Sequence, residues 1–182
     1  RNRLFNIGTP GNHDYGYQKS ENSRTRFPEC FPFERNNTWR VICVAALSNH
    51  NGISLLENAA FESKHPYWGT VLIITSEFHP RNEVLDWAKK LADSEKYKNS
   101  TVIFMTHAYL QEGESAELSK KDNYTIHHGN GGIQIWKKFL QSSKNIDLLI
   151  CAHTGMEISS LRTMWRAEWI KAWQCIENFI WL

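Results

Sequence analysis

The sequence contains few cysteines, and their spacing forms no recognised metal or disulfide motif. Four occur among the 182 residues, at positions 30, 43, 151 and 175, and none belongs to a Cys-x-x-Cys pair. This spacing excludes a zinc ribbon and gives no disulfide framework. A Gly-x-Ser-x-Gly sequence, typical of serine hydrolases, does not occur either. We therefore look for functional residues of other types.

Neither charge of one sign nor long apolar runs dominate the sequence. The 21 Lys and Arg residues nearly balance the 19 Asp and Glu residues, and the resulting net charge of +2 argues against non-specific nucleic-acid binding. The longest apolar runs, 71–75 and 148–152, are far shorter than the roughly 18 residues that a membrane span needs. With 41% apolar and 22% charged residues, the composition is that of an ordinary globular domain.

Between residues 70 and 152, short apolar runs alternate with amphipathic stretches. The runs 70–75, 101–106 and 147–151 are rich in β-branched residues, as in strands buried on both faces. Apolar residues at helical spacing begin near Asn82 and recur over 133–140. The order strand, helix, strand, helix, strand predicts an α/β fold, in which helices flank a mainly parallel sheet.

The first 69 residues have a weaker pattern. Residues 4–9 resemble the end of a strand that leads into a Pro/Gly turn, and residues 15–39 resemble a long polar loop. Strands are expected at 40–47 and 53–56, on either side of an Asn-Gly turn.

Polar residues follow the expected strands where each strand ends. His107 directly follows 101–106, His153 follows 147–151 after one residue, and Asn12, His13 and Asp14 lie in the turn after 4–9. The carboxyl ends of parallel strands meet at one edge of a sheet, where ligands of such folds collect. A single histidine more often packs or forms hydrogen bonds than binds metal. Two in equivalent positions beside an amide oxygen, however, predict a site for Zn, Fe or Mn.

Glu77 and Arg81 also follow a predicted strand. Their positions are compatible with lining a substrate cleft, and equally with a role at the start of the following helix. His79, between them, lies in a turn-like context and has no characteristic spacing.

The ordered blocks Gly11-Asn12-His13-Asp14, Thr106-His107 and His153 resemble the last three signature blocks of the calcineurin-like metallophosphoesterases. The similarity covers about residues 5–17 and 70–155. This resemblance implies a layered α/β domain that hydrolyses a phosphomonoester or phosphodiester. In that family two divalent ions (Mn, Fe or Zn) lie roughly 3.5–4 Å apart at the strand ends.

The resemblance also implies a role for each residue of the motif. Asn12, His107 and His153 would bind the second of the two metals. His13 would contact the phosphate or the leaving oxygen and supply charge stabilisation or a proton. Asp14 would orient His13 and favour its protonated form, although a turn or cap role fits Asp14 as well.

Two blocks of the family, Asp-x-His and Gly-Asp-x-x-Asp, do not occur in the ten residues before Gly11. Because they supply most ligands of the first metal and the bridging aspartate, we expect an amino-terminally truncated domain that holds at most one ion. The remaining ligands are neutral and cannot offset the repulsion between two dications. The rival interpretation is a non-catalytic remnant or binding module.

The last block differs as well, since it reads Ala152-His153-Thr154-Gly155 instead of Gly-His-x-His. Gly155 offers no side-chain ligand, and alanine at 152 adds a methyl group where the backbone is expected to need glycine. The sequence begins at Arg1, so we expect the natural amino terminus to lie upstream. It leaves the compartment and oligomeric state open.

Residues 161–182 hold four of the eight tryptophans and differ most from the family pattern. Wound as a helix, their main apolar residues fall within an arc of about 120°. Three interpretations stay open: a helix for a membrane surface or a partner, a helix packed on its own domain, or a misread coding frame. We therefore divide the chain into a partial metallophosphoesterase domain (1–160) and a Trp-rich amphipathic tail (161–182).

Overall fold

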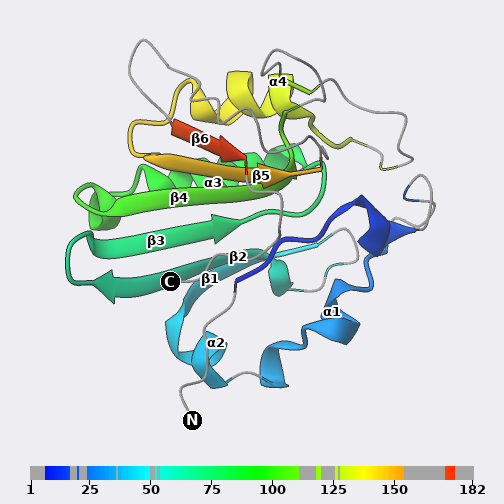
Figure 1. Cartoon of the computed structure of the whole chain (residues 1–182), viewed down its shortest axis with the longest axis horizontal. Coiled ribbons are helices and arrows are strands. Elements are labelled where there is room, and N and C mark those ends of the chain that lie inside the picture. Colours follow the sequence, from blue (N-terminus) through cyan, green and yellow to red (C-terminus); the bar gives the residue numbers. More distant parts are fainter. Residues whose placement is uncertain are drawn as a thin grey trace.

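The computed structural model describes residues 7–16, 20, 24–35, 37–49, 52, 54–110, 118–119, 126, 128–153 and 171–174. Within these residues, six strands form one sheet in chain order, as Figure 1 shows. The strands β1 (Cys43–Ser48), β2 (Ser54–His65) and β3 (Gly69–Thr75) pair in antiparallel fashion. The strands β4 (Thr101–Ala108), β5 (Leu148–Ala152) and β6 (Lys171–Gln174) continue the sheet parallel to β3. The α/β fold predicted from the sequence is confirmed.

The helices that follow β3 and β4 cover one face of the sheet. They lie at the sequence positions at which helices were predicted. The helix α3 (Asn82–Ala92) buries Val84, Leu85, Ala88 and Ala92, which lie on one side at helical spacing. The helix α4 (Gly132–Ile135) continues as one π-helical turn, η4 (Trp136–Leu140), and a 3-10 turn, η3 (Glu95–Tyr97), precedes β4. Leu85 and Phe139 from these helices share a core with Leu72 and Ile74 of β3.

Residues 71–74 of β3 are all apolar because both faces of the strand are buried there. Leu72 and Ile74 face the core formed by α3 and η4, whereas Val71 and Ile73 belong to a second cluster. Ile7 packs against this second cluster. The continuous apolar run in the sequence is therefore that of a strand covered on two sides.

The region before β1 differs from the predicted long loop. It contains α1 (Phe27–Cys30), the 3-10 turn η2 (Phe33–Arg35) and α2 (Asn37–Ile42). Phe27 and Trp39 are buried in a cluster with Leu56 and Phe61 of β2, and this packing stabilises short helices that the local sequence does not indicate.

Strand boundaries in the first third were also predicted imperfectly. Residues 40–42 end α2, so β1 begins only at Cys43, and β2 runs to His65 because it pairs with β3 along its second half. Residues 7–10 form no strand, and residues 4–6 lie outside the described part of the chain.

In the tail, residues 171–174 are a strand rather than part of the helix that their spacing suggested. They pair with Leu148–Cys151 of β5. Without a neighbour on this side, β5 would present a row of unpaired backbone N–H and C=O groups. These groups favour pairing with another strand, even though the apolar spacing of residues 171–174 suggested a helix. The other residues of 161–182 lie outside the described part. Among the residues that the structure describes, no helix has the length and apolar character to cross a membrane.

Gly132 starts α4 at a point where two other backbone segments come very close. A Cβ atom at this position would lie 1.9 Å from the Tyr109 carbonyl oxygen and 2.9 Å from the Ser119 nitrogen. We expect Gly132→Ala to lower the free energy of unfolding by about 3 kcal/mol, because backbone atoms cannot move aside as side chains do.

Urea unfolding of Gly132→Ala and of the matched variant Gly8→Ala measures this difference. A Cβ at Gly8 would make only ordinary contact with the Phe27 ring, at 3.8 Å, so we expect a change below about 1 kcal/mol. Equal losses in the two variants would contradict the expected clash.

Candidate metal centre

The 3-10 turn η1 (Asn12–Tyr15) carries the Asn-His-Asp segment to the edge of the sheet. The Gly11 N–H donates to the Asp14 carboxylate at 2.7 Å, and the Asp14 N–H donates to the Gly11 carbonyl at 3.1 Å, which closes the turn. Thr9 Oγ1 donates to the Ser76 carbonyl just beyond β3. Figure 1 shows this blue segment on the side toward which β3 and β5 point.

Asn12, His107 and His153 come together at this edge. The Oδ1 atom of Asn12 lies 3.0 Å from Nε2 of His107 and 3.2 Å from Nδ1 of His153. The two imidazole rings meet edge to face, with centroids 5.0 Å apart. Residues 12, 107 and 153 thus reach one point, although the sequence separates them by as many as 141 positions.

The strands themselves position the two histidines. His107 is the penultimate residue of β4. The pairing of β4 with β5 is irregular between Met105 and Ala108. Such an irregularity re-aims a side chain at the end of a strand. His153 directly follows β5 and has a φ of 78°, in the left-handed region.

This positive φ corrects an expectation about Ala152. Its methyl group was expected to occupy a position that needs glycine, yet Ala152 is the regular last residue of β5. The unusual backbone belongs to His153, one residue later. Histidine adopts this conformation more readily than most residues, so the alanine adds no strain of this kind.

Asn12 Oδ1 lies from each histidine nitrogen at the distance that separates two ligands of one divalent ion. Ligand atoms about 2.1 Å from an ion lie roughly 3.0–3.4 Å from one another in octahedral or tetrahedral geometry. Both distances from Asn12 Oδ1, 3.0 and 3.2 Å, fall in this range. Two imidazole nitrogens and one amide oxygen also suit Mn, Fe or Zn chemically. These residues therefore fit a single ion.

A second ion does not fit the described residues. They contain no group of three or more His, Cys, Asp or Glu side chains arranged to hold a metal. Asn12, His107 and His153 carry no charge, so their side chains could not neutralise two adjacent dications.

His107 is held in its neutral form. Burial, followed by the charges of His153, His13 and His79, lowers the pKa of His107 to about 3. A neutral imidazole is the form that binds metal, because a protonated ring has no free lone pair to donate.

Gly11 allows the turn to lie directly against the His107 ring. A Cβ at Gly11 would lie 2.9 Å from Cε1 of His107 and 3.1 Å from each of its ring nitrogens. Any larger residue at position 11 would displace either the turn or the imidazole.

The two residues predicted to act on the substrate lie on the same turn. The His13 side chain is exposed, and its charge acts on His107. The Asp14 carboxylate accepts the hydrogen bond from Gly11, which is the cap role that the sequence left open. Phosphate contact by His13 and its orientation by Asp14 stay predictions.

Phe78 and His79 belong to this edge, although sequence analysis assigned no role to either. The Phe78 ring is fully buried and lies 5.7 Å from the His107 ring and 5.8 Å from the His153 ring, centroid to centroid. His79 is also buried, with a φ of 50°, and its ring lies 4.2 Å from that of Phe78. They follow β3, so the convergence of parallel strand ends was a signal that could have indicated them.

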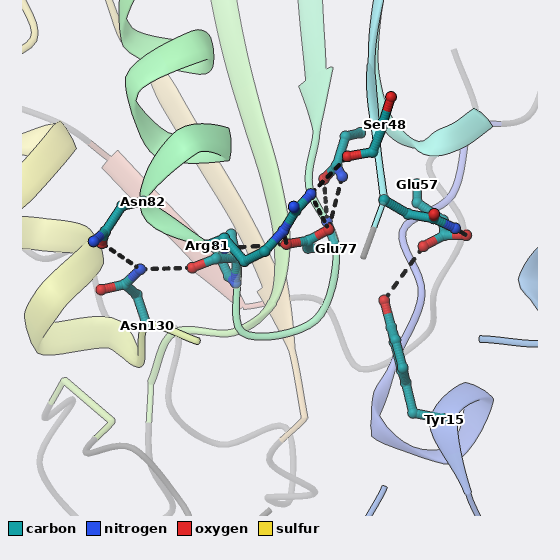
Figure 2. A network of polar contacts seen from close by, with 10 residues as sticks. Tyr15, Ser48, Glu57, Glu77, Arg81, Asn82 and Asn130 are labelled. Atoms are coloured by element: carbon teal, nitrogen blue, oxygen red, sulfur yellow. Dashed lines mark hydrogen bonds and ion pairs between the residues drawn. The ribbon is translucent and has the colours of Figure 1, made fainter. Parts of the chain in front are cut away.

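Glu77 and Arg81 form the centre of the polar network in Figure 2. Glu77 is fully buried, so it does not line a cleft; its Oε1 accepts from the Arg81 Nε at 2.8 Å and from the Arg81 backbone N–H at 3.1 Å. Asn58 Nδ2 donates to Glu77 Oε2 at 2.8 Å, and Arg81 Nη2 donates to the Ser48 carbonyl at 2.6 Å. The network ties the ends of β1 and β3 and the middle of β2 to the start of α3.

A second buried carboxylate, Glu57, connects this network to η1. It accepts a hydrogen bond from Asn49 Nδ2 at 3.0 Å. It accepts a second one from the Tyr15 hydroxyl at 3.4 Å, which Figure 2 shows. Burial, with a smaller contribution from the charge of Glu77, raises the pKa of Glu57 to about 7 against the opposing effect of the Asn49 hydrogen bond. The group therefore changes charge near neutral pH.

Comparison with known protein families matches residues 2–156 to the calcineurin-like phosphoesterases. The chain belongs to this family, as the resemblance of its sequence blocks predicted. No curated protein sequence and no solved structure matches the chain significantly.

The raised pKa of Glu57 predicts a pH-dependent stability. In the folded protein Glu57 stays protonated up to about pH 7, whereas in the unfolded chain its pKa has the ordinary value of 4.5. Between these two pH values the folded state therefore binds more protons than the unfolded state. The contribution of Glu57 to the free energy of unfolding therefore falls as pH rises from 4.5 to 7, by at most about 3 kcal/mol.

Because the pKa of His107 is lowered in the folded protein, its contribution to the free energy of unfolding rises between about pH 3 and 6.5. In the wild-type protein this rise partly cancels the fall caused by Glu57. Urea unfolding of the wild type and of Glu57→Gln across pH 4.5–8 separates them. As pH rises, the free energy of unfolding of the wild type should decrease relative to that of Glu57→Gln. A difference that stays constant with pH would rule out the titration of Glu57.

Proposed function

We propose that this chain is part of a metal-dependent phosphoesterase that hydrolyses a phosphomonoester or phosphodiester, with two metal ions in the complete enzyme and at most one held here. The observation that carries the proposal is the convergence of Asn12, His107 and His153 on one point in a chain of the calcineurin-like family. Mn, Fe and Zn are the ions that suit these ligands.

In this mechanism each residue near the strand ends has a defined part. A divalent ion bound at the site would supply Lewis acidity toward a phosphoryl oxygen. His107 and His153 would hold it through nitrogen lone pairs, and Asn12 through its amide oxygen. His13, exposed on the same turn, contacts the phosphate or the leaving oxygen and supplies charge stabilisation or a proton. Asp14 keeps the turn closed, so that Asn12 and His13 stay on the same side of the sheet edge.

The rival function is a non-catalytic remnant or binding module that holds at most one metal. The neutral ligand set favours it, since no acidic cluster for a second ion occurs in the described part of the chain. Both functions use the same three ligands, so they differ in turnover rather than in binding.

Turnover of a chromogenic phosphate ester with and without added Mn²⁺ tests the proposed activity. We expect metal-dependent hydrolysis that falls at least about 100-fold in His107→Ala and in His153→Ala, because loss of even an outer partner of a metal ligand costs 10–100-fold. The matched variant His65→Ala removes an imidazole from the β2–β3 hairpin, at the opposite edge of the sheet, and should retain activity. No hydrolysis at any Mn²⁺ concentration would favour the remnant.

The stoichiometry of metal binding tests the ligand set independently of turnover. Equilibrium dialysis against Mn²⁺ should give at most one bound ion per chain, since three neutral ligands hold only one dication. His107→Ala should abolish this binding, whereas His65→Ala should leave it unchanged. Two tightly bound ions per chain would contradict the proposed single site.

A further inference from the structure

We propose that Phe78 is a positioning residue whose ring holds His107 and His153 at the angle at which both imidazoles meet Asn12. This inference rests on the proposed function, because it assigns a role within the same metal site. Phe78 lies shortly after the end of β3, and the sequence indicated no role for it.

Phe78 is the one described ring that contacts both ligand histidines. Its centroid lies 5.7 Å from that of His107, edge to face, and 5.8 Å from that of His153, in a tilted arrangement. These distances lie within the range of stabilising aromatic pairs, in which the angle between rings matters. Since the two imidazoles also contact each other at 5.0 Å, the three rings restrict one another's rotation.

The backbone that carries Phe78 is anchored on both sides. Before it, the Glu77 N–H donates to Asn58 Oδ1 at 2.8 Å, and the Glu77 carboxylate accepts from Asn58 and Arg81. After it, Asn130 Nδ2 donates to the Pro80 carbonyl at 2.7 Å. A ring on such a fixed segment is able to impose a geometry on its neighbours instead of following theirs.

The floor beneath the histidines is apolar as well as fixed. Phe78 forms a buried cluster with Tyr15, Ala108 and Ile126, and Tyr15 belongs to the turn that carries Asn12. Phe78 thus contacts all three segments that bring a ligand: η1 through Tyr15, the end of β4 through His107, and the residue after β5 through His153. No other described residue links the three in this way by its ring.

The metal-free protein offers a direct readout of this geometry. An amide oxygen only accepts hydrogen bonds, so hydrogen bonds to Asn12 Oδ1 require a proton on Nε2 of His107 and on Nδ1 of His153. The two histidines are therefore expected in opposite tautomers. The ¹⁵N chemical shifts of the rings report the tautomer, and a histidine released from this arrangement would exchange between both forms.

The test compares Phe78→Leu with Phe139→Leu, a matched control. Phe139 is also fully buried and also makes an edge-to-face pair, with Phe104 at 5.0 Å, but it lies in the helix core. Both variants lose a buried ring, so both should lower the melting temperature. Only Phe78→Leu should mix the tautomers of His107 and His153 and weaken Mn²⁺ binding, by about 10-fold.

Phe78→Leu with unchanged tautomers and unchanged Mn²⁺ affinity would overturn the inference, as would equal effects in Phe139→Leu. Should Phe78→Leu fail to fold, Phe78→Met, whose unbranched side chain adapts better to the space left by the ring, takes its place with the same expected results. If the wild-type protein binds no Mn²⁺, the proposed function fails, and the tautomers alone decide the role of Phe78. If the wild type binds Mn²⁺ and Phe78→Leu binds equally well with unchanged tautomers, only the positioning role fails.

Discussion

The site depends on one constraint, which is the parallel pairing of β4 and β5. Their ladder brings Ala108 opposite Ala152, so His107 and His153 leave the sheet side by side. The irregularity of the ladder at His107 and the positive φ of His153 then turn both rings toward Asn12. Without this pairing the two histidines would lie apart, and each would be a single histidine of the kind that packs or forms hydrogen bonds.

Charge sets the limit on what these residues can do. The convergent donors are two imidazoles and an amide, and burial keeps His107 neutral. Such a set suits one ion, whereas a pair of dications needs carboxylates nearby. The carboxylates that the structure does bury, Glu57 and Glu77, serve a different purpose: they bind Asn49, Asn58 and Arg81 and tie the sheet to η1 and α3.

Buried polar and aromatic contacts therefore act together behind the ligands. The Glu77 network fixes the segment after β3, and that segment presents Phe78 to both histidines. Glu57 reaches the turn of Asn12 through Tyr15.

Part of this architecture follows from the sequence alone. The apolar runs predicted β3, β4 and β5, and the helical spacing after Asn82 predicted α3, because burial on both faces of a strand or on one face of a helix leaves a periodic pattern. The order of these elements was enough to expect His107 and His153 at one edge. Asn12 was expected there as part of a turn after a strand, whereas residues 7–10 form no strand. The sequence was not enough to predict α1 and α2, which exist only through the packing of Phe27 and Trp39 on β2.

What the sequence determined by itself is that two histidines follow neighbouring parallel strands at one edge, since this follows from local periodicity and from residue type. Their grouping with Asn12 as one set of ligands was implied by the family resemblance and stays a prediction. The tertiary structure alone decided which atoms of these side chains face one another. It also decided that the buried Glu77 pairs with Arg81, that Phe78 packs against both histidines, and that residues 171–174 pair as a strand. These features arise from contacts between residues far apart in the chain, and no local pattern records them.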